Sequence, residues 1–365
     1  MAQEIYFREN IRERLSEIIR ERGIEKLLLV CGGSFDALPL SGDILSLDAG
    51  IVRFGGFSPN PAYEDICAGL ELFRRESCGA ILAVGGGSAI DTAKCIKLFS
   101  VLDPSRNYLE QEFLPSAVPL IAIPTTAGTG SESTRNAVLY FEGKKYSVGN
   151  DSTLPDFALL CPEVLRDLPE YQKKSTLLDA LCQSIESWWS PRATEESLGY
   201  AREAAARLVG SYRAYLAGDS AAAAEIMLGA NLAGQAINIT ATTAPHAMSY
   251  KLTSLFRIPH GHAVAMVLPE VWEYMLNETD GKPCALRAVL SDIAAALGGR
   301  TAGDGPALFQ GLMDELSMSR HIDASDEQLD HLAESVNLQR LKNNPVPLDT
   351  SAVRSLYERI SRHDS

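Results

Sequence analysis

Three of the six histidines in the chain stand close together, as His246, His260 and His262 in the segment 245–269. A proline and a glycine flank His260, so an irregular turn is expected there within otherwise apolar sequence. Imidazoles gathered near such a turn are typical of a metal site or of an acid–base centre. Polar side chains at helix ends would give the same local pattern, so the surrounding elements have to decide between these interpretations.

Two oxygen donors precede the histidines on a predicted helix. Asp179 lies in an apolar helical stretch, where a buried carboxylate needs a partner or a metal ion. Gln183 follows at i+4 and shares its face of the helix. Together with His246 and His260 they offer one carboxylate, one amide oxygen and two imidazoles, a donor set that suits Fe²⁺ or Zn²⁺. A helix cap or a solvated face is the alternative for Asp179 alone.

Glycine-rich turns follow short apolar runs in the first half of the chain, at residues 32–34 and 85–88. The second turn joins a strand expected over 80–84 to a helix expected from about residue 89. Glycines let the backbone approach a ligand, and a helix N-terminus favours an anionic pyrophosphate. The spacing is neither GxGxxG nor that of a P-loop, and a tight turn without a ligand is the alternative. A third apolar run leads into a hydroxyl-rich loop at 125–131, which suits a ribose, a phosphate or a nicotinamide amide unless it is a solvent loop.

Strands alternate with helices as far as residue 165, and beyond it the spacing is almost entirely helical. The first part predicts an α/β domain over residues 1–165, with ligands at the carboxyl ends of its strands. A helix is expected over 8–23 and a strand within 43–54. The second part predicts an all-α domain over residues 166–365. Its expected helices cover 175–189, 195–217, 220–250, 262–276, 282–298, 305–317, 326–337 and 350–362.

The composition is that of a soluble globular protein, with 46% hydrophobic and 22% charged residues. A chain of 365 residues is longer than a single hydrophobic core usually supports, which favours two domains. The net charge of −14 argues against non-specific nucleic-acid binding. Seven dispersed cysteines without a CxxC pair indicate reduced thiols and a cytoplasmic location. The charged N-terminus predicts no signal peptide, and no apolar run is long enough to predict a membrane span.

Four motifs carry a resemblance to a known family: GGGSAIDTAK at 85–94, PTTAGTGSE at 124–132, DALCQSIE at 179–186 and PHGHAVAMVLP at 259–269. In their order and spacing they resemble the iron-containing (group III) alcohol dehydrogenases over nearly the full chain. The resemblance implies a Rossmann-like dinucleotide-binding α/β domain followed by an all-α metal-binding domain. This is the dehydroquinate synthase-like superfold, with catalysis in the cleft between the domains.

The resemblance also implies which residues hold the cofactor and the metal. It assigns the dinucleotide to Gly86, Gly87, Ser88, Asp91, Thr125, Thr126, Ser131 and Lys145. Asp179, His246 and His260 match three of the four metal ligands of the family. The fourth is usually a histidine, but here the position holds Gln183, a neutral and weaker donor. Whether Gln183 or a water completes the set is left open.

Tyr250 stands where many members of the family have a histidine. Its phenol would hydrogen-bond the substrate or relay a proton, and packing is the alternative. In the implied mechanism the metal acts as a Lewis acid on an oxygen atom while hydride passes between the nicotinamide and carbon. Proton delivery is then assigned to Tyr250, His262 or water.

Cofactor preference follows from the first glycine-rich turn. Many NAD-dependent relatives have an acidic residue there, which holds the ribose and repels a 2′-phosphate. Here the positions are Gly32, Gly33 and Ser34. We therefore expect the protein to accept NADPH as well as NADH.

The segment 242–263 is similar to the branch of the family that reduces phosphonoacetaldehyde to 2-hydroxyethylphosphonate. An anionic phosphonate needs fixed donors, and Arg135, Asn150, Lys251 and Arg257 are the candidates, although each alone would also fit a solvent-facing role. The expected partners are a small aldehyde or alcohol, without nucleic acid or membrane, and a homodimer is allowed. Three alternatives remain: reduction of another small aldehyde, a lyase or cyclase of the dehydroquinate synthase type, and a non-catalytic binding protein.

Overall fold

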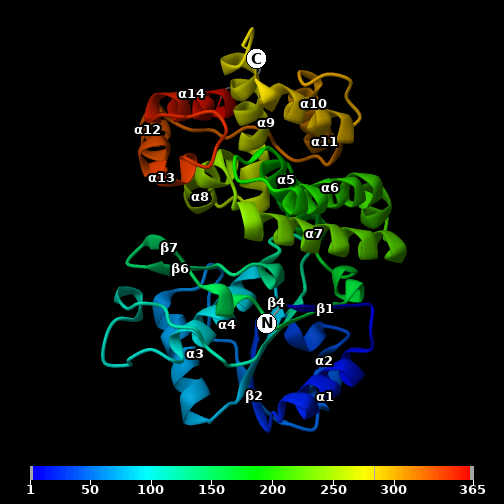
Figure 1. Cartoon of the computed structure of the whole chain (residues 1–365), viewed down its shortest axis with the longest axis vertical. Coiled ribbons are helices and arrows are strands. Elements are labelled where there is room, and N and C mark those ends of the chain that lie inside the picture. Colours follow the sequence, from blue (N-terminus) through cyan, green and yellow to red (C-terminus); the bar gives the residue numbers. More distant parts are fainter. Residues whose placement is uncertain (1–2, 283, 362–365) are drawn as a thin grey trace. The chain divides into compact units, whose positions relative to one another are not determined.

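The computed structural model describes residues 3–282 and 284–361. They form two compact units, divided between Leu168 and Pro169. We call them the N-terminal unit and the C-terminal unit, and Figure 1 labels their elements. The first is an α/β structure and the second is all-helical, which confirms the expected fold class.

The N-terminal unit is built on a six-stranded parallel sheet with the strand order β1-β8-β5-β4-β2-β3. Its strands are β1 (Glu4–Phe7), β2 (Lys26–Cys31), β3 (Gly50–Phe54), β4 (Ala80–Gly85), β5 (Leu120–Pro124) and β8 (Phe157–Leu160). The central strands are short apolar runs buried along nearly their whole length, as parallel strands covered on both faces should be. A separate antiparallel hairpin consists of β6 (Ala137–Phe141) and β7 (Lys144–Val148).

The α-helices of this unit are α1 (Ile11–Arg22), α2 (Ser41–Leu45), α3 (Tyr63–Arg75) and α4 (Gly87–Phe99). Short 3₁₀ turns occur at Phe35–Ala37, Tyr108–Glu110, Ser131–Ser133, Asp151–Thr153 and Pro162–Leu165. The strand expected within 43–54 starts only at Gly50, because the residues before it form α2 and a turn. The predicted helix over 8–23 corresponds to α1, which Asn10 caps and Gly23 ends in a left-handed conformation.

The strand order reverses beside β2, and this positions the glycine-rich turns. From β2 the chain goes to β3 on one side and then returns to place β4 on the other side. Such a reversal leaves a crevice at the carboxyl ends of the two strands on either side of it. Cys31 pairs with Val84 in the register of β2 and β4, so the turns after both strands emerge side by side.

The C-terminal unit consists of helices only. They are α5 (Glu170–Trp189), α6 (Glu195–Leu216), α7 (Ser220–Thr240), α8 (Ala244–Phe256), α9 (His260–Glu278), α10 (Ala285–Ala296), α11 (Asp304–Glu315), α12 (Asp326–Ser335), α13 (Leu338–Leu341) and α14 (Thr350–Ser361). α5 is buried continuously from Ser175 to Trp189 and forms the centre of the unit, packed against α6, α7 and α9. Among the described residues, no helix combines the length and apolar character needed to span a bilayer.

One helix expected from the sequence is in fact two. The prediction of a continuous helix over 220–250 is wrong, because α7 ends at Thr240 and α8 starts at Ala244. Pro245 has no N–H to continue the helical ladder, so it lies in the first turn of a new helix. At the break Ala241 has φ 56° and ψ 172°, a conformation that costs an alanine free energy and that surrounding contacts have to hold.

Candidate functional site

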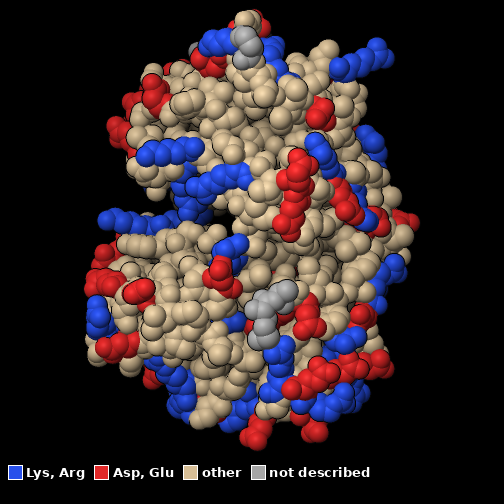
Figure 2. All heavy atoms as spheres, viewed as in Figure 1, with Lys and Arg blue, Asp and Glu red and all other residues tan. Residues whose placement is uncertain are grey.

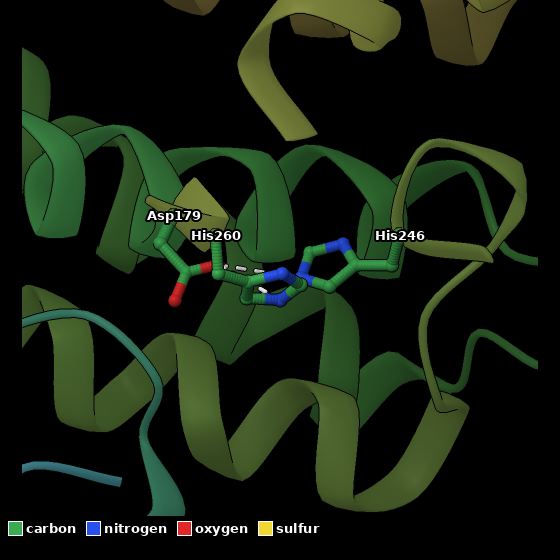
Figure 3. A group of neighbouring side chains, drawn as sticks. All are labelled: Asp179, His246 and His260. Carbon is green, nitrogen blue, oxygen red and sulfur yellow. Dashed lines mark ion pairs between the residues drawn. The ribbon is translucent and has the colours of Figure 1, made fainter. Parts of the chain in front are cut away.

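Asp179, His246 and His260 converge inside the C-terminal unit, from α5, α8 and α9 respectively (Figure 3). Nε2 of His246 lies 3.4 Å from Oδ1 of Asp179, and Nε2 of His260 lies 4.0 Å from the same oxygen. One ligand atom from each residue falls within 4.8 Å of the other two. Asp179 and His246 are buried, whereas the His260 side chain is 35% exposed.

A glycine allows α9 to start close enough to α5 for this convergence. His260 is the first residue of α9, and Gly261 follows it directly against α5. A Cβ atom on Gly261 would lie 2.0 Å from the carbonyl oxygen of Ser175 and 2.7 Å from Cβ of Asp179. No larger residue fits at this position unless the two helices move apart, and that movement would separate His260 from Asp179.

A buried carboxylate sets the orientation and tautomer of His246. Nδ1 of His246 makes a short hydrogen bond with Oε1 of Glu186, which is fully buried on α5. The other oxygen, Oε2, accepts from the backbone N–H of Thr243 at 2.6 Å and from its hydroxyl at 2.8 Å. A carboxylate is an acceptor only, so Nδ1 carries the proton in neutral His246. Nε2 then offers its lone pair towards Asp179, as in metal sites whose histidines are held by a carboxylate.

Ser249 fixes the tautomer of His260 in the same way, with the proton on Nδ1. The Ser249 hydroxyl donates to the carbonyl oxygen of His246 at 2.9 Å, which uses its proton. Its oxygen lies 3.4 Å from Nδ1 of His260 and accepts from that nitrogen. In its neutral form, each of the two histidines therefore directs a proton-free Nε2 atom towards Asp179.

The buried polar atoms of this cluster fit a divalent cation. Oδ1 of Asp179 and Nε2 of His246 are buried, and neither has a hydrogen-bond partner among the described residues. Burial opposes charge on His246, but Glu186 and Asp179 outweigh it and raise the pKa of the imidazole to about 9. Burial likewise opposes charge on Asp179, yet the two histidines hold the pKa of that carboxyl below its usual value. The polar groups thus already stabilise a carboxylate in the interior, and one anionic oxygen with two imidazole nitrogens suits Fe²⁺ or Zn²⁺.

Gln183 is buried one helical turn after Asp179, as its i+4 spacing predicts. A hydrogen bond from its side chain contributes to the lowered pKa of Asp179. Only the amide N–H₂ group of a glutamine can donate to a carboxylate. Gln183 therefore supports Asp179, and its role as a fourth ligand remains a prediction.

The Tyr250 ring packs against the His260 ring. The two rings are stacked, with centroids 5.7 Å apart and an interplanar angle of 9°. Nη1 of Arg340, on α13, donates to the Tyr250 hydroxyl at 2.8 Å, and its guanidinium carbon lies 5.2 Å from the ring centroid. The tyrosine is thus fixed between an expected metal ligand and an arginine that the sequence analysis did not single out.

Both ring nitrogens of His262 have partners within the C-terminal unit. Nε2 lies 2.7 Å from the carbonyl oxygen of Ser319, which can only accept, so Nε2 carries the proton. Nδ1 then accepts from the hydroxyl of Tyr171 at 2.8 Å. Burial lowers the pKa of His262. These contacts hold a neutral imidazole in place, and the predicted proton-handling role would require one of them to open.

The residues expected to hold the dinucleotide gather in the N-terminal unit. Gly86 is the N-cap of α4, and a Cβ atom on it would lie 3.2 Å from the Thr126 hydroxyl. The N–H of Thr125 donates to the carbonyl oxygen of Gly85. The second and third ligand-binding loops predicted from the sequence are therefore in direct contact, and the turn of Gly32, Gly33 and Ser34 follows the neighbouring strand β2.

Asp91 and Ser131 are joined by a hydrogen-bond network that also contains a buried lysine. The Ser131 hydroxyl donates to Oδ1 of Asp91 at 2.5 Å, and the N–H of Val138 donates to Oδ2 at 3.0 Å. Nζ of Lys94 donates to the Ser131 hydroxyl at 3.0 Å, and burial lowers the pKa of Lys94 to about 8. The Asp91 carboxylate thereby ties α4 to the loop that carries Ser131, with Lys145 among the charges that act on it.

Two other predicted cofactor and substrate residues have clear local partners. Ser88 accepts from the N–H of Asn60 at 3.2 Å. Asn150 donates to the carbonyl oxygen of Phe113 and accepts from Ser152, so its amide stabilises its own loop.

The three predicted substrate-binding cations differ in their surroundings. Arg135 forms an ion pair with Asp151 at 2.5 Å. Lys251 on α8 and Arg257 at the C-terminus of α8 have no ion-pair partner among the described residues. Arg135 is therefore already neutralised by a carboxylate, whereas the other two are available to an anion.

Sequence reasoning missed several residues of the site. Glu186 closes the motif at 179–186 and lies two helical turns after Asp179, so its spacing could have found it. Lys94 closes the motif at 85–94 in the same way. Nothing in the sequence pattern pointed to Arg340 or to Asn343, whose amide donates to the carbonyl oxygens on both sides of Ala241.

Comparisons with known proteins cover both units. Residues 2–162 match the family described as "Iron-containing alcohol dehydrogenase", and residues 173–361 match "Fe-containing alcohol dehydrogenase family, C-terminal". The Escherichia coli (strain K12) protein "Probable alcohol dehydrogenase EutG" is 36% identical over 59% of this chain and 56% of that relative. The match thus spans little more than half of that relative's length.

Two further relatives match almost from end to end. The phosphonoacetaldehyde reductase of Streptomyces viridochromogenes is 31% identical over 94% of this chain and 92% of that protein. The solved structure of sulfoacetaldehyde reductase from Bifidobacterium kashiwanohense, in complex with NAD+, superposes with a TM-score of 0.89 at 25% identity. This superposition covers 99% of this chain and 98% of that one.

Proposed function

Because this chain belongs to the iron-containing alcohol dehydrogenase family, we propose that it interconverts an aldehyde and the corresponding alcohol, using NADPH or NADH and a divalent metal ion. The observation that carries the proposal is the convergence of Nε2 of His246, Nε2 of His260 and Oδ1 of Asp179, with Asp179 and His246 buried. Fe²⁺ or Zn²⁺ would be held by these three residues, with Gln183 beside them.

When bound, the ion would supply Lewis-acid polarisation of the substrate oxygen, and the reduced nicotinamide would supply the hydride. The chain's own residues fix the geometry for this chemistry. Glu186 and Ser249 hold the two imidazoles with Nε2 deprotonated, and Gly261 brings His260 up to Asp179. Tyr250 is the proposed proton donor, because its ring stacks on His260 and Arg340 donates to its oxygen, so the phenolic O–H is not directed at Arg340.

The dinucleotide is assigned to the crevice beside the strand reversal of the sheet. Amide groups at the N-terminus of α4 would bind its pyrophosphate, as the N-cap position of Gly86 supports. Asp36, the first acidic residue after β2, is ion-paired with Arg53 at 2.8 Å. A 2′-phosphate there would meet no unpaired carboxylate from that residue, which supports NADPH as a cofactor.

For the substrate we propose phosphonoacetaldehyde, which would be reduced to 2-hydroxyethylphosphonate. Two relatives that match over most of the chain are named for aldehydes with an anionic head group, one a phosphonate and one a sulfonate. Seven unpaired thiols agree with a cytoplasmic location, and a homodimer stays a prediction.

The test is a reductase assay on metal-stripped protein that has been reloaded with Fe²⁺ without oxygen, or with Zn²⁺. Oxidation of NADPH and of NADH is followed with phosphonoacetaldehyde and with propionaldehyde. We expect activity only in reloaded protein, and a fall of about 100-fold or more in His260→Ala, since the variant loses a ligand. His331→Ala, an exposed histidine on α12, is the matched control and should retain activity. Full activity without metal would contradict the proposal, and bound NAD that turns over without net reduction would indicate a lyase or cyclase.

A further inference from the structure

Arg340 is a half-buried cation without a carboxylate partner. Its only hydrogen bond to a side chain among the described residues goes to the neutral hydroxyl of Tyr250. Several other arginines of the C-terminal unit have a carboxylate partner, such as Arg213 with Glu315 at 2.5 Å and Arg354 with Asp330 at 2.6 Å. In a chain of net charge −14, a half-buried arginine without an acidic partner is a candidate to bind an anionic ligand.

The guanidinium still has donors to give. An arginine carries five N–H groups in a planar fork, and the contact with Tyr250 uses one of them. The fork matches two oxygens of a phosphonate, sulfonate or carboxylate in parallel, which a single point charge cannot do. Stacking against the Tyr250 ring limits the directions that the fork can take.

The position of Arg340 relates it to the metal cluster. Tyr250 stacks on His260, and His260 is one of the three residues that face the proposed metal. An oxyanion bound to Arg340 would therefore lie one aromatic ring away from the place where the aldehyde oxygen is polarised. A short substrate, with two carbons between the head group and the carbonyl oxygen, suits two groups placed on either side of one ring.

The surface around Arg340 has the charge that an anionic substrate needs. Lys251, Arg257 and Lys342 belong to α8 and to the end of α13. Figure 2 shows Lys and Arg side chains gathered over these two helices, and in this view no Asp or Glu of the described residues lies between them. Such a patch attracts an anion and raises its local concentration, although the protein as a whole carries a negative net charge.

We propose that Arg340 binds the oxyanion head group of the substrate and thereby selects short anionic aldehydes over neutral ones. Tyr250 positions the guanidinium through its hydroxyl and its ring. This inference rests on the proposed function, since it names the residue that recognises the substrate class at the same site. Neither charge pattern nor family resemblance had pointed to this arginine.

The experiment compares Arg340→Gln and Arg340→Lys with Lys342→Gln, an exposed neighbour that removes the same charge without a contact to Tyr250. For phosphonoacetaldehyde we expect KM to rise by about 10- to 100-fold in Arg340→Gln, because the variant loses charge-assisted hydrogen bonds to the head group. For propionaldehyde kcat/KM should fall far less than for phosphonoacetaldehyde, because only the contact with the Tyr250 hydroxyl, and no head-group contact, is lost. Arg340→Lys should recover only part of the affinity, since an ammonium cannot form two parallel bonds.

Calorimetric binding of 2-hydroxyethylphosphonate to metal-loaded protein without cofactor gives a second readout. We expect binding by the wild type, binding by Lys342→Gln that is weakened only by the loss of one surface charge, and loss of binding in Arg340→Gln. Equal losses for both aldehydes would reveal a purely structural role and overturn the inference, as would unchanged binding of the phosphonate. The wild type could bind 2-hydroxyethylphosphonate but reduce no aldehyde, while Arg340→Gln does not bind it. That outcome would refute the proposed reaction and support the assignment of Arg340.

Discussion

Replacing Glu186 by Gln should weaken metal binding although Glu186 contacts no metal ligand atom. Glu186 accepts three hydrogen bonds, two at Oε2 from Thr243 and one at Oε1 from His246. A glutamine keeps one acceptor oxygen and turns the other into a donor. Two donors on Thr243 outweigh one on His246, so the carbonyl oxygen of the new side chain should face Thr243. Its N–H₂ group then forces Nδ1 of His246 to accept, and the imidazole proton moves to Nε2.

The expected loss of metal affinity follows from the position of this proton, which occupies the lone pair on Nε2 that would bind the metal. With Nε2 protonated, His246 must break a hydrogen bond before it can bind a cation. Loss of the group that orients a ligand typically costs about 10- to 100-fold in metal affinity. The converse orientation would leave the buried N–H of Thr243 facing a donor, at a cost of about 1–3 kcal/mol in the free energy of unfolding. We expect the first effect to dominate, so the variant should fold and bind Zn²⁺ about 10- to 100-fold more weakly.

Competition with a coloured chelator measures the Kd for Zn²⁺. Nitrogen-15 NMR of labelled histidine, recorded above the His246 pKa of about 9, reports which ring nitrogen carries the proton. Glu170→Gln is the matched control, since it makes the same change on an exposed side chain of α5. It should leave both readouts as in the wild type. A Glu186→Gln protein with an unchanged Kd and a proton still on Nδ1 of His246 would refute the reasoning.

Two other predictions concern packing and pH. Gly261→Ala should lower the free energy of unfolding of the metal-free protein by about 1–3 kcal/mol in urea and reduce its metal content, because the new Cβ overlaps α5. Gly199→Ala on α6, where a Cβ meets nothing within 4 Å, should instead be neutral or stabilising, and equal behaviour of the two variants would contradict the argument. Hydrogen bonds from Arg213 and Tyr212 lower the pKa of Glu315 from 4.5 to about 2. The stability that this carboxylate adds is complete above pH 4.5 and is lost as the pH falls towards about 2, so Glu315→Gln should unfold in acid with a shallower pH dependence over that window.

The sequence predicts the N-terminal unit well because its signals are local. An apolar run followed by glycines marks a buried parallel strand that turns into a helix, and β4 and α4 show this pattern. The break between α7 and α8 was missed because alanines and threonines, which a helix can accommodate, continue through it, and Pro245 was the clearest warning. A proline tolerated in the first turn of one helix and a proline that ends another look alike in a single sequence.

For the candidate site, the motif residues were predictable and their supports were not. Asp179, His246 and His260 could be grouped because their donor types belong together, and the structure places them within reach of one ion. Arg340 comes ninety residues after Tyr250, and only tertiary packing brings the two into contact. No periodicity or spacing rule connects positions so far apart, which is why the specificity residue proposed here emerged from the structure alone.

The amide of Asn343 has a consequence for the order in which the protein matures. It holds the strained Ala241 turn by bonding to the carbonyl oxygens of Thr240 and Thr242, and that turn presents Thr243 to Glu186. A growing chain that has emerged only as far as α12 already contains every expected metal ligand but lacks this clamp. The clamp that holds this turn is therefore added to the chain after every expected metal ligand has been synthesised.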